Sequence, residues 1–272
     1  MTPACHREGQ QAGSTAFREV LIGVAAACAN NKDFLRLKEE SEKPGVLYLV
    51  ASPIGNLEDL SLRSKKILSD CDLIACEDTR VTAKLLAHLG INQSLISYRE
   101  ENEKKQTPLL AEKLLQGKQL ALLSDAGYPG ISDPGFRLIR ECHLRSIRVI
   151  PIPGPNAAIT ALAASGLPTH QFLYLGFFPK KDNGVIKILE QWKDFPGSII
   201  FYESRYKVAR TLRLIRETLG TNRYVCMARE ITKLYETIHS GTIEEVENKY
   251  HSESPKGEFT LVVAPQDYSF SK

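Results

Sequence analysis

Four short segments rich in glycine, proline and small polar residues each follow an apolar run of strand length. They are Ser52–Asn56, Glu77–Arg80, Ser124–Gly135 and Pro153–Ala157. Glycine lets a backbone approach a ligand closely, and proline stiffens the loop that holds it. Because ligands of open parallel sheets bind outside the carboxyl ends of the strands, we expect the four segments to converge on one ligand-binding rim. None has the glycine spacing of a dinucleotide site or of a phosphate-binding P-loop.

From Gly45 onward, apolar runs of strand length alternate with amphipathic runs of helix length. The pattern predicts strands at 46–51, 73–76, 95–97, 120–124 and 148–152, and helices at 57–68, 79–89, 107–115 and 134–144. Strands that are apolar throughout are typical of a parallel sheet covered on both faces. The sequence therefore predicts an N-terminal α/β domain over residues 44–165.

A C-terminal α/β domain is predicted over residues 166–267, after a helix at 159–165 that Gly166 and Pro168 end. Its strands are expected at 172–177, 198–202, 223–228 and 258–264, and its helices at 184–192, 207–219 and 243–249. The connections vary more here, so we expect a mixed sheet, with 268–272 as a tail. Residues 180–216 carry nine Lys/Arg against four Asp/Glu, which is either a solvated helix face or a surface for an anionic ligand.

The composition is that of a globular protein. Of the 272 residues 43% are hydrophobic and 25% charged, and 35 basic against 32 acidic residues leave a net charge of +3, which excludes a polybasic coat protein. No apolar stretch approaches the ~20 residues of a membrane-spanning helix. The six cysteines form no Cys-x-x-Cys pair and no histidine pair has zinc spacing. We therefore expect no metal and a reducing, cytoplasmic location.

Residues 1–43 form an N-terminal extension whose role the sequence leaves open. The apolar run Val20–Ala29 precedes Asn30 as the core of a signal peptide would, but Glu8 and Glu19 stand where such a peptide needs a basic segment. A short accessory helix and a start codon assigned too far upstream are the other interpretations.

Eight runs of residues that occur in order resemble one known family. They are SPIGNLEDLSLR (52–63), CEDTR (76–80), SDAGYPGISDPG (124–135), PIPGPNAA (151–158), ASGLPT (164–169), FYES (201–204), ARE-TK (228–233) and KGEF (256–259). Together they closely resemble the tetrapyrrole-methylase superfamily and, within it, the ribosomal RNA small subunit methyltransferase I group. The resemblance covers about residues 45–265.

The resemblance implies two α/β domains with S-adenosylmethionine bound in the cleft between them. It also implies 2′-O-methylation of a cytidine ribose in the decoding region of 16S rRNA in the 30S subunit, by a cytoplasmic homodimer. By position in the matching runs, the cofactor pocket is formed by Asp125, Ala126, Gly127, Ile131, Pro155, Asn156, Ala157, Tyr202, Glu203, Ala228, Arg229 and Glu230.

Methyl transfer from a sulfonium to a ribose hydroxyl is an in-line displacement by a poor nucleophile. Aligning donor and acceptor can supply ~7–11 kcal/mol, whereas a general base contributes ~10²–10⁴ in rate. The candidate bases are Glu77, Asp78, Glu203, Glu230 and, if burial lowers its pKa, Lys233. Asp78 could instead cap a helix, and Glu203 could pair with Arg229.

RNA contacts are expected from two groups of residues. Arg80, Lys180, Lys181 and Arg205 are candidates for phosphate contacts, and the loop Pro53–Asn56, with Asn56 itself and Tyr98, for contacts to an unstacked nucleotide. Arg205-Tyr206 replaces the Pro-His common in the family, which removes one conceivable base.

Two other functions remain open. A methylase of a small tetrapyrrole-like acceptor would need a wide apolar cleft. A catalytically inactive ribosome-binding protein would keep the basic segment without consuming the cofactor.

Overall fold

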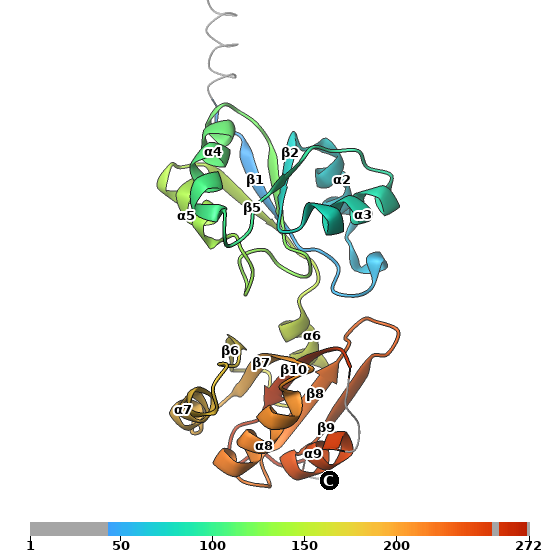
Figure 1. Ribbon diagram of the computed structural model, residues 1–272, viewed down its shortest axis with the longest axis vertical. Helices are drawn as coiled ribbons and strands as arrows, with labels where there is room; N and C mark the ends of the chain where they lie inside the picture. The colour runs from blue at the N-terminus through green and yellow to red at the C-terminus, as the bar shows by residue number, and fades with distance from the viewer. Residues whose placement is uncertain (1–42, 252–255, 271–272) are drawn as a thin grey trace, which may run out of the picture.

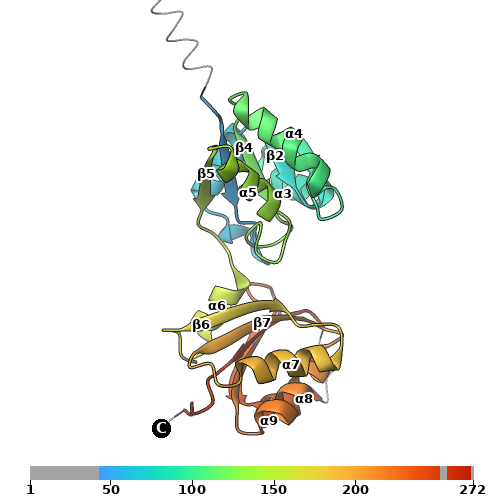
Figure 2. The same ribbon diagram turned by 90° about the vertical axis from the view of Figure 1, so that its left-hand side faces the viewer.

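The computed structural model describes residues 43–251 and 256–270, so nearly all of the predicted N-terminal extension and the last two residues of the tail lie outside the described residues. Two lobes follow one another along the longest axis, each built on its own five-stranded sheet (Figure 1, Figure 2). The first sheet comes from residues 46–152 and the second from 172–263. Within the described ranges, no helix has the length and apolar character that crossing a membrane requires.

The first sheet is parallel throughout, as predicted, with strand order β3-β2-β4-β1-β5. Its strands are β1 (Val46–Val50), β2 (Leu73–Cys76), β3 (Leu95–Ser97), β4 (Leu120–Leu123) and β5 (Arg148–Ile152). Helices α4 (Glu103–Leu115) and α5 (Phe136–Leu144) pack on one face, and α2 (Leu62–Asp70) and α3 (Thr79–Leu89) on the other (Figure 1). This double coverage explains why the central strands are apolar at nearly every position.

The second sheet is mixed, which confirms the prediction, and its strand order is β6-β7-β10-β8-β9. Its strands are β6 (Phe172–Phe177), β7 (Ser198–Ser204), β8 (Tyr224–Arg229), β9 (Thr237–Thr242) and β10 (Glu258–Val263). The β6–β7 pair is parallel, and β10 and β9 run antiparallel to their neighbours. One face is covered by α7 (Asp182–Trp192), α8 (Val208–Leu219) and α9 (Ile243–His251).

Two elements differ from the expectation for local reasons. The predicted helix at 57–68 is a short 3₁₀ turn, η1 (Leu57–Asp59), followed by α2, because the Ser61 hydroxyl caps α2 by accepting a hydrogen bond from the Ser64 N–H at 3.0 Å. Strand β9 was not predicted. Its sequence TIHSGT has no apolar run from which a strand could be predicted. The strand lies at the edge of the sheet and pairs only with β8, a position that accepts polar residues.

Helix α6 (Ala157–Ala164) connects the two lobes and packs on the second sheet. Ala158 and Leu162 are buried there with Ile200 and Val262. The sequence had placed this helix in the first domain, 44–165. Because its apolar contacts are with the second sheet, we propose a domain boundary just before α6.

Candidate active site

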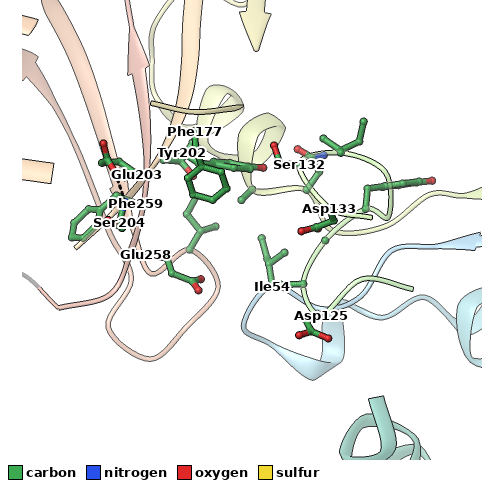
Figure 3. Close-up of a pocket in the computed structure, with 18 of the residues that line it drawn as sticks. Ile54, Asp125, Ser132, Asp133, Phe177, Tyr202, Glu203, Ser204, Glu258 and Phe259 are labelled. Carbon is green, nitrogen blue, oxygen red and sulfur yellow. Dashed lines mark hydrogen bonds between the residues drawn. The ribbon is translucent and has the colours of Figure 1, made fainter. Parts of the chain in front are cut away.

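A cavity of about 410 Å³ lies between the two lobes (Figure 3). Ile54, Glu77, Asp125 and Asn156 line it, and each comes from a different one of the four polar loops of the first lobe. The second lobe contributes residues from β7 and β10 and from the end of β6, with the Tyr202 ring prominent among them. The predicted convergence of the four loops on one rim is confirmed.

Hydrogen bonds fasten the first-lobe loops to one another. Ser52 and Gly127 exchange two backbone hydrogen bonds of 2.8 and 3.0 Å, and the Ser52 hydroxyl donates to the Ser124 carbonyl at 2.7 Å. The Asp125 carboxylate accepts from the Asp78 N–H at 3.0 Å. Gly127 has φ 78°, a conformation that a side chain would strain. The loops after β1, β2 and β4 therefore form one preorganised wall of the cavity.

Further contacts fix the first lobe against the second. The hydroxyls of Ser132 and Tyr174 are hydrogen-bonded at 2.6 Å, and the Asn56 N–H donates to the Thr232 hydroxyl at 3.1 Å. Gly55 also approaches closely, since a Cβ there would lie 2.8 Å from the Thr232 hydroxyl oxygen. Ser132 and Thr232 both have positive φ, at 61° and 67°. Such backbone strain persists where the surrounding structure over-determines it, and it is concentrated at functional sites.

Three carboxyl groups of the first lobe line the cavity: Glu77, Asp125 and Asp133. Burial raises the pKa of each one, and neighbouring carboxylates add to the effect. The pKa of Asp133 reaches about 6. A carboxyl group with that pKa exchanges its proton near neutral pH, as a general base must. Among the described residues, no group of three His, Cys, Asp or Glu side chains is arranged to hold a metal ion.

Comparison with known proteins identifies the family. Residues 46–247 match the family of tetrapyrrole (corrin/porphyrin) methylases. The chain belongs to this family. The ribosomal RNA small subunit methyltransferase I of Halalkalibacterium halodurans is 46% identical to this methylase over 225 residues, which cover 83% of this chain and 78% of that protein. The protein of the same name from Escherichia coli O157:H7 is 46% identical over 221 residues, covering 80% and 77%.

A solved structure agrees in fold. Diphthine synthase superposes on this tetrapyrrole methylase with a TM-score of 0.62 and 11% identity, over 83% of this chain and 92% of that one. The predicted two-domain α/β fold of the family is therefore confirmed. Its methyl donor is S-adenosylmethionine, as in the other methylases of the family.

The cavity of this tetrapyrrole methylase fits that donor. Its volume falls in the range of small-molecule sites, ~300–1,000 Å³. Ile54, Ile131 and Tyr202 offer apolar surface for an adenine ring and a methionine chain. The carboxylates of Asp125 and Asp133 offer acceptors for ribose hydroxyls and partners for an ammonium group. S-adenosylmethionine supplies an electrophilic methyl group, and these residues would hold the molecule that carries it.

Most of the predicted cofactor residues line the cavity, namely Asp125, Ala126, Gly127, Ile131, Asn156, Ala157, Tyr202 and Glu203. Pro155 lies beside them in the same loop. Ala228 is a correction: it is fully buried in the second sheet, so its side chain cannot contact the donor. Arg229 and Glu230 are not among the lining residues. Arg229 Nε donates to the Lys256 carbonyl at 2.6 Å, and Glu230 accepts from the Glu258 N–H at 2.9 Å.

Two of the predicted bases have structural partners instead. Asp78 caps α3 by accepting from the Arg80 N–H at 2.8 Å, and its carboxylate pairs with the Arg80 guanidinium. These bonds hold the pKa of Asp78 far below its usual range, so it is a weak base. Glu203 is buried, and its carboxylate accepts from the Thr211 hydroxyl and the Ser204 N–H, both at 2.7 Å. These contacts give both residues a structural role, and their role as bases stays a prediction.

Glu230 and Lys233 form an ion pair on the second lobe. Lys233 Nζ lies 3.1 Å from Glu230 and 2.9 Å from Glu258. Burial lowers the pKa of Lys233, but the two carboxylates outweigh it and raise the pKa above the usual value. Burial raises the pKa of Glu230, but hydrogen bonds from Glu258 and Lys233 outweigh it and lower the pKa. Lys233 lines the cavity, but its raised pKa keeps the amine protonated at neutral pH, so it does not accept a proton there. Glu230 is ionised, but its lowered pKa makes it a weaker base and it lies outside the lining of the cavity.

The predicted RNA contacts are mostly accessible. Asn56, Arg80, Lys180, Lys181 and Arg205 are exposed, and Pro53 is half-buried. Tyr98 is a correction. It has no exposed surface, and its hydroxyl bonds with Thr107 at 2.8 Å and accepts from the Leu138 N–H at 3.2 Å. A fully buried ring cannot stack on a nucleotide, and this one belongs to the core between α4 and α5.

Several residues of the cavity are not predicted by the sequence analysis, among them Asp133, Ser132 and Phe177. Asp133 and Ser132 stand within the polar loop Ser124–Gly135, so their membership of that loop was the available signal. Phe177 ends β6 and gave no signal, because an aromatic residue in a strand is ordinarily part of the core.

Proposed function

We propose that this methylase transfers a methyl group from S-adenosylmethionine to small-subunit ribosomal RNA, and that its acceptor is the 2′-hydroxyl of a cytidine in the decoding region. The observation that carries the proposal is the 46% identity, over about four fifths of the chain, to relatives named ribosomal RNA small subunit methyltransferase I. The choice of cytidine and of the 2′-hydroxyl rests on the family resemblance of the polar loops.

Positioning of donor and acceptor supplies most of the rate enhancement in this proposal. A preorganised site can contribute ~7–11 kcal/mol by aligning the reacting atoms. The hydrogen bonds between Ser52, Ser124 and Gly127 fix the wall of the cavity, and the Ser132–Tyr174 pair holds that wall against the second lobe. These contacts support an arrangement in which the donor lies between the lobes and the ribose enters from the open side.

The proton of the ribose hydroxyl is taken by a carboxylate of the first lobe. Glu77 and Asp133 line the cavity, and burial together with the charge of Glu77 raises the pKa of Asp133 to about 6. The ionised carboxylate of Asp133 accepts the hydroxyl proton as the oxygen attacks the methyl group and S-adenosylhomocysteine leaves. A base in this position contributes ~10²–10⁴ in rate.

The RNA partner is the 30S subunit, and the active form is a homodimer in the cytoplasm; both parts of the proposal rest on the family resemblance. The exposed residues Asn56, Arg80, Lys180, Lys181 and Arg205 are proposed to contact the RNA around the acceptor. The Arg80 guanidinium pairs with Asp78 and is still exposed. It can therefore contact a phosphate while Asp78 continues to cap α3.

Methyl transfer tests the proposal. The purified chain is incubated with labelled S-adenosylmethionine and 30S subunits from a strain that lacks its gene, and the label is located by nuclease digestion and mass spectrometry. We expect one 2′-O-methylcytidine in the decoding region and no incorporation into 30S subunits from the parent strain. Label on a base, or transfer only to a tetrapyrrole precursor, would contradict the proposed acceptor. Cofactor binding without transfer to any of these acceptors would indicate an inactive binding protein.

A further inference from the structure

Two large aromatic side chains are exposed at the end of the second sheet that faces the cavity. Phe177 is 60% exposed at the carboxyl end of β6, and Tyr206 is 80% exposed just after β7. Phe177 lines the cavity, and so does Ser204, two residues before Tyr206. Because β6 and β7 are parallel neighbours, both aromatic residues stand at the same end of the sheet, where these two strands have their carboxyl ends. Exposed aromatic residues gathered at one place mark a binding surface.

Each ring is supported from one side. Phe177 packs against Tyr202, with ring centroids 5.5 Å apart and planes inclined by 63° (Figure 3). The Arg205 guanidinium lies 4.5 Å from the centre of the Tyr206 ring in a cation–π contact. Arg205 also donates to the Tyr206 hydroxyl. These contacts orient the rings and still leave most of their surface accessible.

Basic residues follow or adjoin each ring in the sequence. Lys180 and Lys181 are exposed three and four residues after Phe177, and Arg205 stands beside Tyr206. We name this group the basic-aromatic rim; it consists of Phe177, Lys180, Lys181, Arg205 and Tyr206. Such a surface suits a ligand that is anionic and offers flat rings, as unpaired RNA does.

The opposite side of the cleft carries negative charge. A second hollow, of about 590 Å³, adjoins the cavity and shares Glu77, Asp125 and Asp133 with it. We name six of the carboxylates around this hollow the acidic rim; they are Glu77, Asp78, Glu100, Glu101, Asp125 and Asp133. Glu103 also lines the hollow and pairs with Arg137. Apart from the exposed guanidinium groups of Arg80 and Arg99, this surface repels phosphates. A strand that reaches the cavity is therefore guided over the second lobe.

We propose that the basic-aromatic rim is a stacking platform for an unpaired nucleotide next to the methylated one, and that Lys180 and Lys181 contact its phosphate. The inference rests on the proposed function and adds the entry path of the RNA. It assigns a role to Tyr206, which stands where the family commonly has histidine, and to Phe177.

Binding of a fluorescently labelled single-stranded oligocytidine, measured by anisotropy with S-adenosylhomocysteine present, tests the platform. Tyr206→Ala lowers the affinity about 5- to 100-fold, the range expected for loss of one base–aromatic stack. Tyr206→Phe keeps the ring and binds nearly as the wild type does. Phe172→Ala is the matched control, because Phe172 is 44% exposed at the opposite end of β6. The double variant Lys180→Ala/Lys181→Ala lowers the slope of log K against log salt by about 1–2.

The outcomes separate this inference from the proposed function. If the wild type methylates 30S subunits but Tyr206→Ala binds the oligocytidine as tightly as the wild type, the platform is wrong and the methyltransferase proposal stands. If Tyr206→Ala leaves RNA affinity unchanged and instead changes the oligomeric state in solution, the rim is an interface between copies of the chain. If the wild type neither binds the oligocytidine nor methylates 30S subunits, both proposals are wrong.

Discussion

The two rims that face each other across the cavity differ in charge and in composition. The acidic rim comes from the loops after β2, β3 and β4 of the parallel sheet, whereas the basic-aromatic rim comes from the ends of β6 and β7 in the mixed sheet. The first is tied together by short hydrogen bonds and contains carboxyl groups with raised pKa values. The second exposes side chains that offer stacking surface and positive charge.

This difference indicates that the two rims have separate functions, one in methyl transfer and the other in RNA binding. Carboxylates in a partly dehydrated loop can hold a cationic donor and accept a proton, but they repel a phosphate backbone. Arginine, lysine and aromatic side chains attract RNA and have no base of suitable pKa. A site that must do both tasks is therefore built from two domains of opposite character. Variants on the two rims are expected to have different effects on transfer and on RNA binding.

The largest effect is expected at Asp133. Asp133→Asn removes a proposed base, so the single-turnover rate of methyl transfer falls ~10²–10⁴-fold. Because the pKa of Asp133 is about 6, ionisation of its carboxyl makes the wild-type rate rise with pH up to about 6 and then level off. The variant loses this rise. Rate against pH from 5 to 8 is the measurement.

Asp70→Asn is the control, since Asp70 is an exposed carboxylate paired with Lys66 on α2. A rate for Asp133→Asn within threefold of the wild type, with the same pH profile, would assign the base to Glu77 or to another group.

The next effect concerns stability. The buried carboxylate of Glu203 accepts a hydrogen bond from the Thr211 hydroxyl, so Thr211→Val leaves it with the Ser204 N–H alone and lowers the free energy of unfolding by ~1.5–3 kcal/mol. Methyl transfer by the folded fraction stays near the wild-type rate. Denaturant unfolding measures the loss, with Thr218→Val on the same helix as control. An unchanged stability and a lower transfer rate would indicate that Glu203, which lines the cavity, takes part in the reaction.

A smaller effect is expected at Lys233. Lys233→Met removes the ion pairs with Glu230 and Glu258 but not a base, because the pKa of Lys233 is raised and its amine is protonated at neutral pH. The transfer rate therefore falls less than about tenfold, and its pH profile keeps the wild-type shape. A loss above 100-fold, together with a changed pH profile, would mean that Lys233 takes part in proton transfer.

The smallest effect is expected at Tyr98. Tyr98→Phe removes a hydroxyl bonded to Thr107 and Leu138 and costs ~1 kcal/mol of unfolding free energy. RNA affinity is unchanged, since the ring is fully buried. Thermal unfolding and oligocytidine binding are compared with those of Tyr235→Phe, which changes an exposed ring. Weaker RNA binding by Tyr98→Phe alone would show that this ring becomes accessible.

Periodicity and loop chemistry predicted most of the first lobe. The apolar strands identified a parallel sheet, and the rule that ligands bind at the carboxyl ends of strands located the cavity before any contact was known. Asp78 indicated the start of α3, where the structure has a capping carboxylate, and the helix ends at a left-handed Gly90. These features depend on residues that are close together in the sequence, and for that reason the sequence alone could predict them.

The misses depend on tertiary contacts. The sequence of β9 is polar because one neighbouring strand suffices to form it. Tyr98 was assigned to RNA because a tyrosine after a strand gives no indication of the helix that will cover it. Glu203 and Lys233 were assigned as bases because their partners, Thr211 and Glu258, are eight and 25 residues away. The raised pKa of Asp133 likewise depends on Glu77, which lies in another loop.

The division of labour between the rims is tested most directly by single-turnover methyl transfer to unmethylated 30S subunits over a range of subunit concentrations. The wild type, Asp133→Asn and Tyr206→Ala are compared. We predict that Asp133→Asn lowers the rate at saturating subunits and leaves the half-saturating concentration nearly unchanged. Tyr206→Ala raises the half-saturating concentration more than it lowers the saturating rate. If both variants change the saturating rate and the half-saturating concentration in the same proportion, the two rims do not have separate functions, and the account is contradicted.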